Sequence, residues 1–238
     1  REFVQWIFKE DKKFLIIGNM NSITYSEIFP LIKDNKMWVG NGFKGGNAYF
    51  ETPNATSYGE GVFYEDLNLV KFRNVNWFTN LEHGRRHEPM RLMTMEDNLR
   101  YNKGLISKLE NDYQTDTYPK YDNYDALEVP LRNAIPSDYN EVMGVPTSFL
   151  DVYNPEQFEI LGITSGREEF DELVWPTKRY ENAIQHNKNG STVSGSKVNT
   201  GAQILLKEKP EDSVYYTADN VDGYLKRIYT RLLIRHRR

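Results

Sequence analysis

The sequence contains no cysteine, which excludes disulfide bonds, thiolate nucleophiles and zinc sites built on cysteine. No stretch approaches the roughly 20 consecutive apolar residues that a membrane-spanning helix needs, and the first residues carry no signal-peptide pattern. We therefore expect a cytoplasmic protein that does not span a membrane. Because the chain opens at Arg1, inside a pattern that predicts a helix, we also expect it to be a fragment of a longer protein.

Familiar catalytic patterns are also missing. We find no Ser-His-Asp arrangement, no glycine-rich phosphate loop followed by lysine and no paired-carboxylate signature. His83 and His87 are four residues apart, but Gly84 weakens a helix there and no carboxylate completes a zinc site. We therefore expect no bound metal.

Charge is distributed unevenly along the chain. The 238 residues, 39% of them hydrophobic, are enough to bury a core, and the formal net charge is -4. This balance argues against a uniformly basic nucleic-acid surface, because phosphate contacts need clustered Lys and Arg. Residues 226–238 nevertheless hold Lys226 and Arg227 with further arginines and no acid. They predict a local basic face, or alternatively a solvated strand edge.

The first third of the chain has the pattern of an α/β sheet. Apolar spacing predicts a helix over residues 1–11, and the run at 13–18 predicts a fully buried strand. A second helix is expected up to Lys36, followed at once by a strand at 37–40. This α-β-α-β order is typical of a parallel sheet. Residues 1–82 therefore predict the second half of such a sheet.

Residues 83–238 have a different, irregular and β-rich pattern. We expect a helix at 95–110 and an exposed loop at 187–191. The predicted strands are residues 48–52 and 70–78 before this region, and 158–163, 202–206, 214–217 and 227–234 within it.

Amide and aromatic side chains are the candidates for a binding pocket. Asn19 and Asn21 directly follow a predicted strand, at the end where open sheets bind ligands. Amides can pair with adenine or a polar cofactor, and the alternative is an Asx-type turn that leads into the following helix. Trp77 and Asn80 close another strand, where the alternative for the ring is core packing.

A second aromatic and basic group lies further along. Tyr121 and Asn123 belong to a tyrosine-rich stretch whose rings and amides suit a base extruded from DNA, with core packing as the alternative. Arg85, Arg86 and Arg91 are candidates for DNA phosphate contacts, as are Lys226 and Arg227. A solvated loop is the alternative for the arginines.

Four segments together carry a family resemblance. They read KFLIIGNMN at 13–21, VNWFTNL at 75–81, YPKYDNYDA at 118–126 and GVPTSFL at 144–150, and the match continues through 154–160 and 229–234. In order and spacing they resemble the C-terminal part of EcoRI-type adenine-specific DNA methyltransferases. The resemblance covers nearly the whole chain and is more specific than one short motif.

The resemblance implies an α/β fold, namely the C-terminal half of a Rossmann-like methyltransferase sheet followed by an irregular β-rich target-recognition region. It implies methyl transfer from S-adenosylmethionine to the adenine amine of double-stranded DNA, in a bacterial restriction-modification or phage-related system, without a metal. The family's cofactor loop and its Asn-Pro-Pro-Phe tetrapeptide are absent here and are expected before Arg1, so the fragment alone is expected to be inactive. The alternative is a noncatalytic DNA- or protein-binding module.

Overall fold

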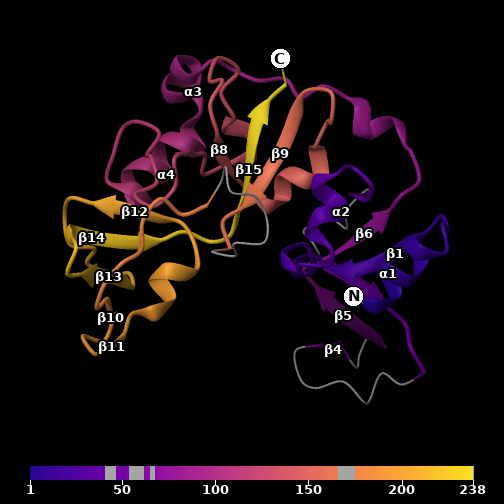
Figure 1. The fold of residues 1–238 in the computed structure, drawn as a ribbon, viewed down its shortest axis with the longest axis horizontal. Coiled ribbons are helices and arrows are strands. Elements are labelled where there is room, and N and C mark those ends of the chain that lie inside the picture. The colour runs from indigo at the N-terminus through magenta and orange to yellow at the C-terminus, as the bar shows by residue number, and fades with distance from the viewer. Residues whose placement is uncertain (41–46, 54–61, 65–67, 166–174, 238) are drawn as a thin grey trace. The chain divides into compact units, whose positions relative to one another are not determined.

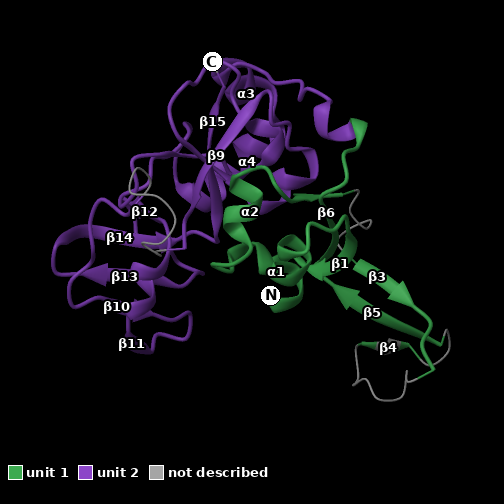
Figure 2. Ribbon diagram, turned by 45° about the vertical axis from the view of Figure 1, so that its right-hand side comes forward, with its two compact units in different colours: residues 1–84 green, residues 85–238 purple. Residues whose placement is uncertain are grey.

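In the computed structural model the chain forms two compact units, residues 1–84 and residues 85–238 (Figure 2). The residues that the structure describes are 1–40, 47–53, 62–64, 68–165 and 175–237 (Figure 1). No helix within these ranges is long and apolar enough to cross a membrane.

The main sheet of unit 1 has three strands in the order β1-β6-β2. The helix α1 (Glu2–Lys9) precedes β1 (Leu15–Asn19), and α2 (Phe29–Lys33) precedes β2 (Trp38–Val39). The predicted α-β-α-β order is therefore confirmed. The third strand, β6 (Val75–Thr79), comes from much later in the sequence.

The expected parallel pairing is wrong for these strands. β6 is antiparallel to both neighbours, with Ile17 opposite Trp77 on one side and Val39 opposite Phe78 on the other. β1 and β2 consequently run in the same direction without pairing directly. The sequence pattern predicts strands but not which strand lies between them, so it could not anticipate the insertion of β6.

The prediction of a fully buried first strand is also wrong. In β1, the side chains of Leu15 and Ile17 are 55% and 40% exposed. On α1, Phe3 and Trp6 are 59% and 55% exposed and their rings stack on each other. Unit 1 therefore leaves several large apolar side chains uncovered by the residues that the structure describes.

A second sheet in unit 1 has the order β3-β5-β4. Its strands are β3 (Asn47–Phe50), β4 (Phe63–Tyr64) and β5 (Leu69–Arg73). The predicted strand at 70–78 is thus two strands, separated at Asn74, which has a positive φ of 54°. Asparagine adopts this left-handed conformation more readily than most residues, so the chain turns there from one sheet to the other.

Two consecutive helices open unit 2 where one was expected. They are α3 (Met95–Tyr101) and α4 (Lys103–Tyr113). The side chain of Thr94 caps α3 by accepting a hydrogen bond from the amide of Asp97 at 3.1 Å. Asn102 ends α3 and caps α4 with a bond from the amide of Leu105, also at 3.1 Å. The predicted single helix is therefore divided at Asn102, whose side chain caps the second helix.

Unit 2 has a four-stranded sheet in the order β7-β8-β15-β9. Its strands are β7 (Leu127–Glu128), β8 (Met143–Pro146), β9 (Phe158–Ile163) and β15 (Arg231–His236). Phe149 and Phe158 are fully buried and meet edge to face, with centroids 5.3 Å apart. Because these two buried rings pack against each other, the sheet forms part of the hydrophobic core of unit 2.

A five-stranded antiparallel sheet follows, in the order β11-β10-β13-β14-β12. Its strands are β10 (Ile184–His186), β11 (Thr192–Ser194), β12 (Gln203–Leu206), β13 (Tyr215–Ala218) and β14 (Val221–Arg227). The loop expected at 187–191 is the β10–β11 connection. The predicted strand 227–234 is divided, because β14 ends at Arg227 and β15 begins at Arg231, so three residues join the two sheets (Figure 1).

Short 3-10 helices complete the described part: η1 (Met20–Thr24), η5 (Gly84–His87), η6 (Arg132–Ala134), η7 (Thr147–Val152) and η9 (Ser196–Thr200).

Candidate functional site

Asn19 and Asn21 lie at the carboxyl end of β1, as predicted, and a third asparagine joins them. The side-chain carbonyl of Asn19 accepts a hydrogen bond from the amide of Asn21 at 2.9 Å, which is the Asx turn considered as the alternative. Asn74 donates from its side-chain amide to the carbonyl of Asn21 at 2.9 Å. This exposed asparagine cluster was only partly visible in the sequence, because Asn74 is 53 residues away from Asn21.

Asn80 does not belong to that cluster. Its carbonyl accepts from the amide of Phe14 at 2.9 Å, and its amide donates to the carbonyl of Lys12 at 3.0 Å. Leu15 lies opposite Thr79 and Asn19 opposite Val75, and Asn80 accepts its hydrogen bond from Phe14. Asn80 thus lies at the other end of β1, about 16 Å from Asn19 at ~3.3 Å per residue. Asn80 therefore connects the start of β1 to the end of β6.

Trp77 lies in the middle of β6 and is partly buried. A Cβ built on Gly40 would lie 3.1 Å from the Cβ of Trp77, so β2 continues alongside this residue at close range. The position suits the packing interpretation and leaves part of the ring accessible.

Tyr121 and Asn123 are both buried in unit 2. The amide of Asn123 donates to the carbonyl of Gly201 at 3.0 Å, and its carbonyl accepts from the amide of Gln203 at 2.8 Å. Both groups of this side chain thus hold the start of β12. Tyr121 donates its hydroxyl to Glu128 and also lines an open cavity of about 300 Å³, together with Lys120, Lys207 and other residues.

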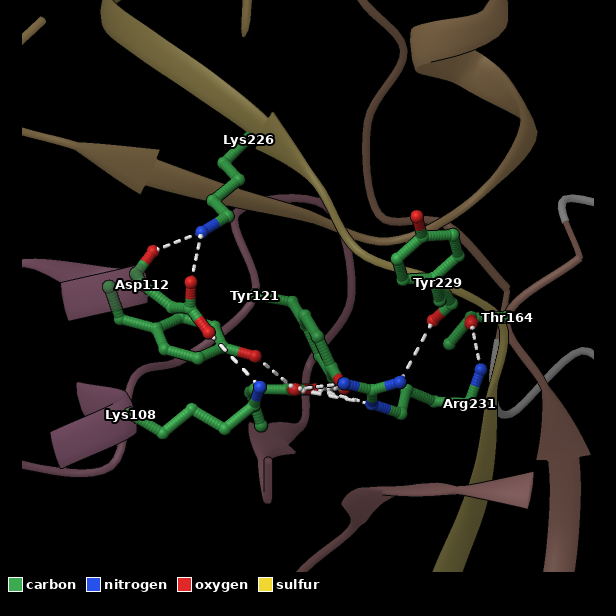
Figure 3. Close-up of polar contacts among 9 residues, drawn as sticks. Lys108, Asp112, Tyr121, Thr164, Lys226, Tyr229 and Arg231 are labelled. Atoms are coloured by element: carbon green, nitrogen blue, oxygen red, sulfur yellow. Dashed lines mark hydrogen bonds and ion pairs between the residues drawn. The ribbon is translucent and has the colours of Figure 1, made fainter. Parts of the chain in front are cut away.

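Glu128 is the centre of a buried polar network, drawn in Figure 3 with Tyr121 and Arg231 labelled. Its side chain is 0% exposed and pairs with Arg231, whose Nη2 lies 2.8 Å from Oε1 and whose Nε lies 3.1 Å from the same oxygen. The hydroxyl of Tyr113 donates to Oε1 at 2.7 Å. The carboxylate thus has charged and neutral donors around it, which a buried charge requires.

The network shifts the ionisation of its members. Burial raises the pKa of the Tyr113 phenol well above its usual value, and the adjacent negative charge of Glu128 raises it further. The same two causes, burial first, raise the pKa of Tyr121. Burial alone would lower the pKa of Arg231, but Glu128 outweighs it and the net shift is upward. Both phenols therefore remain protonated hydrogen-bond donors, and the guanidinium remains charged.

Gly144 allows this network to form. A Cβ added at this position would lie 2.7 Å from Cε2 and Cζ of the buried Tyr121 ring, a distance that real Cβ contacts do not show. Glycine in β8 therefore marks a close approach of a side chain to the backbone.

The predicted phosphate-contacting residues occupy different environments. Arg85 and Arg91 are exposed, and so is Arg227 at the end of β14. Arg86 is buried, with 5% of its surface exposed, so its placement argues against a phosphate contact. Lys226 donates to the backbone carbonyl of Asp112 and lies 3.5 Å from its carboxylate, which directs this cation inward as well (Figure 3).

Asp112 is held by two lysines. Partial burial raises the pKa of its carboxyl, but the hydrogen bond from Lys108 and the charge of Lys226 lower it by more, so the net shift is downward. Lys226 also lies over the ring of Tyr113, 5.3 Å from its centroid. The sequence suggested a basic tail, whereas the structure uses this lysine to join β14 to α4.

The described residues do not form a complete catalytic centre. Within the ranges covered by the structure, no group of three or more His, Asp or Glu side chains is arranged to hold a metal. In the asparagine cluster the side-chain carbonyls of Asn19 and Asn21 accept hydrogen bonds from the chain itself, and the Asn-Pro-Pro-Phe tetrapeptide is absent from the sequence.

The sheets and the few helices define an α/β protein. Its buried charged network, centred on Glu128 and Arg231, lies in the β-rich unit 2. Comparison with protein families goes further. The sequence model of the EcoRI adenine-specific methyltransferase family matches residues 1–237, and the chain therefore belongs to this family.

Individual relatives agree with this assignment. The chain is 41% identical to the Type II methyltransferase M.EcoRI of Escherichia coli over 174 residues, covering 72% of this chain and 49% of the relative. It is 31% identical to the Type II methyltransferase M.MgeORF184P of Mycoplasma genitalium, covering 68% and 47%. M.MpnI of Mycoplasma pneumoniae is also 31% identical, with the same coverage. The chain thus spans about half the length of these relatives, and no solved structure matches it.

Proposed function

We propose that this chain is part of a site-specific DNA methyltransferase of a restriction-modification system, which transfers a methyl group from S-adenosylmethionine to the exocyclic amine of adenine in double-stranded DNA. The observation that carries the proposal is the family match over residues 1–237 together with 41% identity to M.EcoRI. The cofactor loop and the Asn-Pro-Pro-Phe tetrapeptide are absent from this sequence, so in this proposal another part of a longer enzyme supplies the methyl-donor site.

Unit 1 is, in this proposal, the C-terminal half of a Rossmann-like sheet. Two strands that run in the same direction, each preceded by a helix, support it. Asn19 and Asn21, joined by Asn74, would then form one wall of the target-base pocket, because ligands of such sheets bind at the carboxyl ends of strands. Trp77 would support that wall from β6, whereas Asn80 is assigned to holding the strands together.

The outer edge of β1 is where we propose that further strands join the sheet. Among the described residues β1 pairs only with β6, and Leu15 and Ile17 project from the same face of this strand and are exposed. Exposed apolar patches of this kind commonly mark an interface. In the full-length enzyme Ile17→Glu would then lower the free energy of unfolding by about 2 kcal/mol or more, whereas a solvent-facing position would change it by less than about 0.5 kcal/mol.

Unit 2 is proposed to recognise the DNA target. Arg85, Arg91 and Arg227 are the exposed cations that would contact phosphate. The overall net charge of -4 limits nonspecific attraction to DNA, so these local contacts would carry much of the electrostatic contribution.

The decisive experiment measures incorporation of labelled methyl from S-adenosylmethionine into unmethylated duplex DNA by the full-length enzyme, followed by digestion to nucleosides. Appearance of the label in N6-methyladenine is the expected result. DNA already methylated by the same enzyme is the matched control and should accept no label. Duplex binding without any transfer would overturn the proposal and would identify a noncatalytic DNA-binding module instead.

A further inference from the structure

Tyr229 is the most exposed large hydrophobic residue in the described part of the molecule. It is 85% exposed, although the nearby Ile228 and Arg231 are 4% and 8% exposed. It lies in the three-residue connection between β14 and β15, the segment that joins the two sheets of unit 2. A phenol ring is therefore displayed to solvent from a backbone that is anchored on both sides.

Four hydrogen bonds fix that backbone. The amide of Ile228 donates to the carbonyl of Ala202 at 2.9 Å. The amide of Arg231 donates to the hydroxyl of Thr164 at 2.9 Å, and the amide of Thr164 returns a bond to the carbonyl of Arg231 at 2.9 Å. Nη1 of Arg231 lies 3.4 Å from the carbonyl of Tyr229, so the buried guanidinium reaches the exposed turn (Figure 3). The turn is ordered before any ligand arrives, which reduces the entropy lost on binding.

An exposed cation lies beside the turn that carries Tyr229. Arg227, two residues before it, is exposed and donates to the hydroxyl of Thr200 at 3.2 Å. Thr200 in turn donates to the carbonyl of the exposed Lys197 at 2.8 Å. Residues 190–207 and 226–238 contain no acidic residue, and within the described ranges neither cation forms an ion pair.

We propose that Tyr229 and Arg227 form a DNA contact in which the ring packs against the deoxyribose of a nucleotide while the guanidinium binds the adjacent phosphate. Contacts of tyrosine and arginine side chains to sugar and phosphate are among those that position proteins on duplex DNA. The inference rests on the proposed function and deepens it, because it assigns a DNA contact to a residue outside the pocket wall.

The test uses the full-length enzyme and a short fluorescein-labelled unmethylated duplex, with the dissociation constant measured by fluorescence anisotropy at several salt concentrations. Tyr229→Ala should weaken binding about ten-fold with the salt dependence unchanged, because the packing of an apolar ring face is not electrostatic. Tyr229→Phe should bind as the wild type does. Arg227→Gln should reduce the magnitude of the negative slope of log affinity against log salt concentration by about 1, which is the change expected when one phosphate contact is lost.

The matched control is Tyr101→Ala, which removes another exposed tyrosine of unit 2, 59% exposed on α3. It should leave binding unchanged. Equal affinities for Tyr229→Ala and Tyr101→Ala, with wild-type binding intact, would overturn the Tyr229 contact and leave the methyltransferase proposal standing. A wild-type enzyme that neither binds nor methylates the duplex would overturn both. Unchanged thermal unfolding of each variant confirms that the fold is not the cause.

Discussion

Replacement of Arg231 by methionine tests the buried network directly. The guanidinium supplies two nitrogens to Glu128, at 2.8 Å from Nη2 and at 3.1 and 3.2 Å from Nε. Methionine fills part of the volume but leaves a carboxylate that is 0% exposed with only phenol donors. Removal of one partner from a buried ion pair typically destabilises a protein by about 3–5 kcal/mol, and we expect a loss of this size.

Urea unfolding, followed by circular dichroism, measures the effect as a change in the free energy of unfolding. The matched control is Arg235→Met on the same strand, whose guanidinium pairs with Glu159 at 2.7 Å while its side chain is 42% exposed. Such a solvent-screened pair contributes at most about 1 kcal/mol. The double variant Glu128→Gln with Arg231→Met should recover part of the loss, since a neutral amide still accepts the phenol hydrogen bonds without leaving a charge buried.

An Arg231→Met variant that is destabilised no more than Arg235→Met would show that Glu128 does not depend on Arg231 for compensation of its charge. A further loss of stability on adding Glu128→Gln to Arg231→Met would show that the penalty does not arise from an uncompensated charge.

Three further predictions concern the same unit. Gly144→Ala should destabilise it by about 1–3 kcal/mol through the contact with Tyr121, whereas Gly84→Ala, with nothing within 4 Å of the added Cβ, should be nearly neutral in thermal unfolding. Thr94→Ala removes the α3 cap and should cost about 1 kcal/mol in urea unfolding, with Thr94→Ser retaining most of the stability. The pKa of Tyr113 is raised by burial and by Glu128, so the unfolded chain releases its proton first, above about pH 10; stability should fall as pH rises beyond that value, and less steeply in Tyr113→Phe.

Local elements were predictable because they depend on short-range patterns. The helix at the start of the chain, the strand after it and β9 (Phe158–Ile163) follow from apolar spacing. The breaks at Asn74 and Asn102 were missed, although asparagine often marks a left-handed turn or a helix cap. Strand order was not predictable, because the hydrogen bonds that place β6 between β1 and β2 connect residues about 60 positions apart on one side and about 40 on the other and leave no mark in local composition.

In the candidate site, too, local positions were predictable and long-range contacts were not. Asn19 and Asn21 were identified from their place after a strand, but their link to Asn74 depends on the return of the chain. Lys226 looked like part of a basic tail, yet Asp112, more than one hundred residues earlier, accepts its hydrogen bonds. The sequence only weakly indicated that Glu128 and Arg231 are buried. Each is a charged residue next to apolar residues, Glu128 in a short strand and Arg231 in a predicted one. Their pairing across 103 residues was not predictable.

The buried pair and the exposed tyrosine are parts of one arrangement. An apolar pair in place of Glu128 and Arg231 is often no less stable than a buried ion pair, so stability alone does not explain a charge in this position. Arg231 does something that an apolar residue cannot, since the same guanidinium that binds Glu128 also reaches the carbonyl of Tyr229. Because the hydrogen bonds of a guanidinium are directional, Arg231 holds the backbone of the turn in place, which an apolar side chain of the same size would not do. The polar network in the core thus orients the surface at which we place the DNA contact.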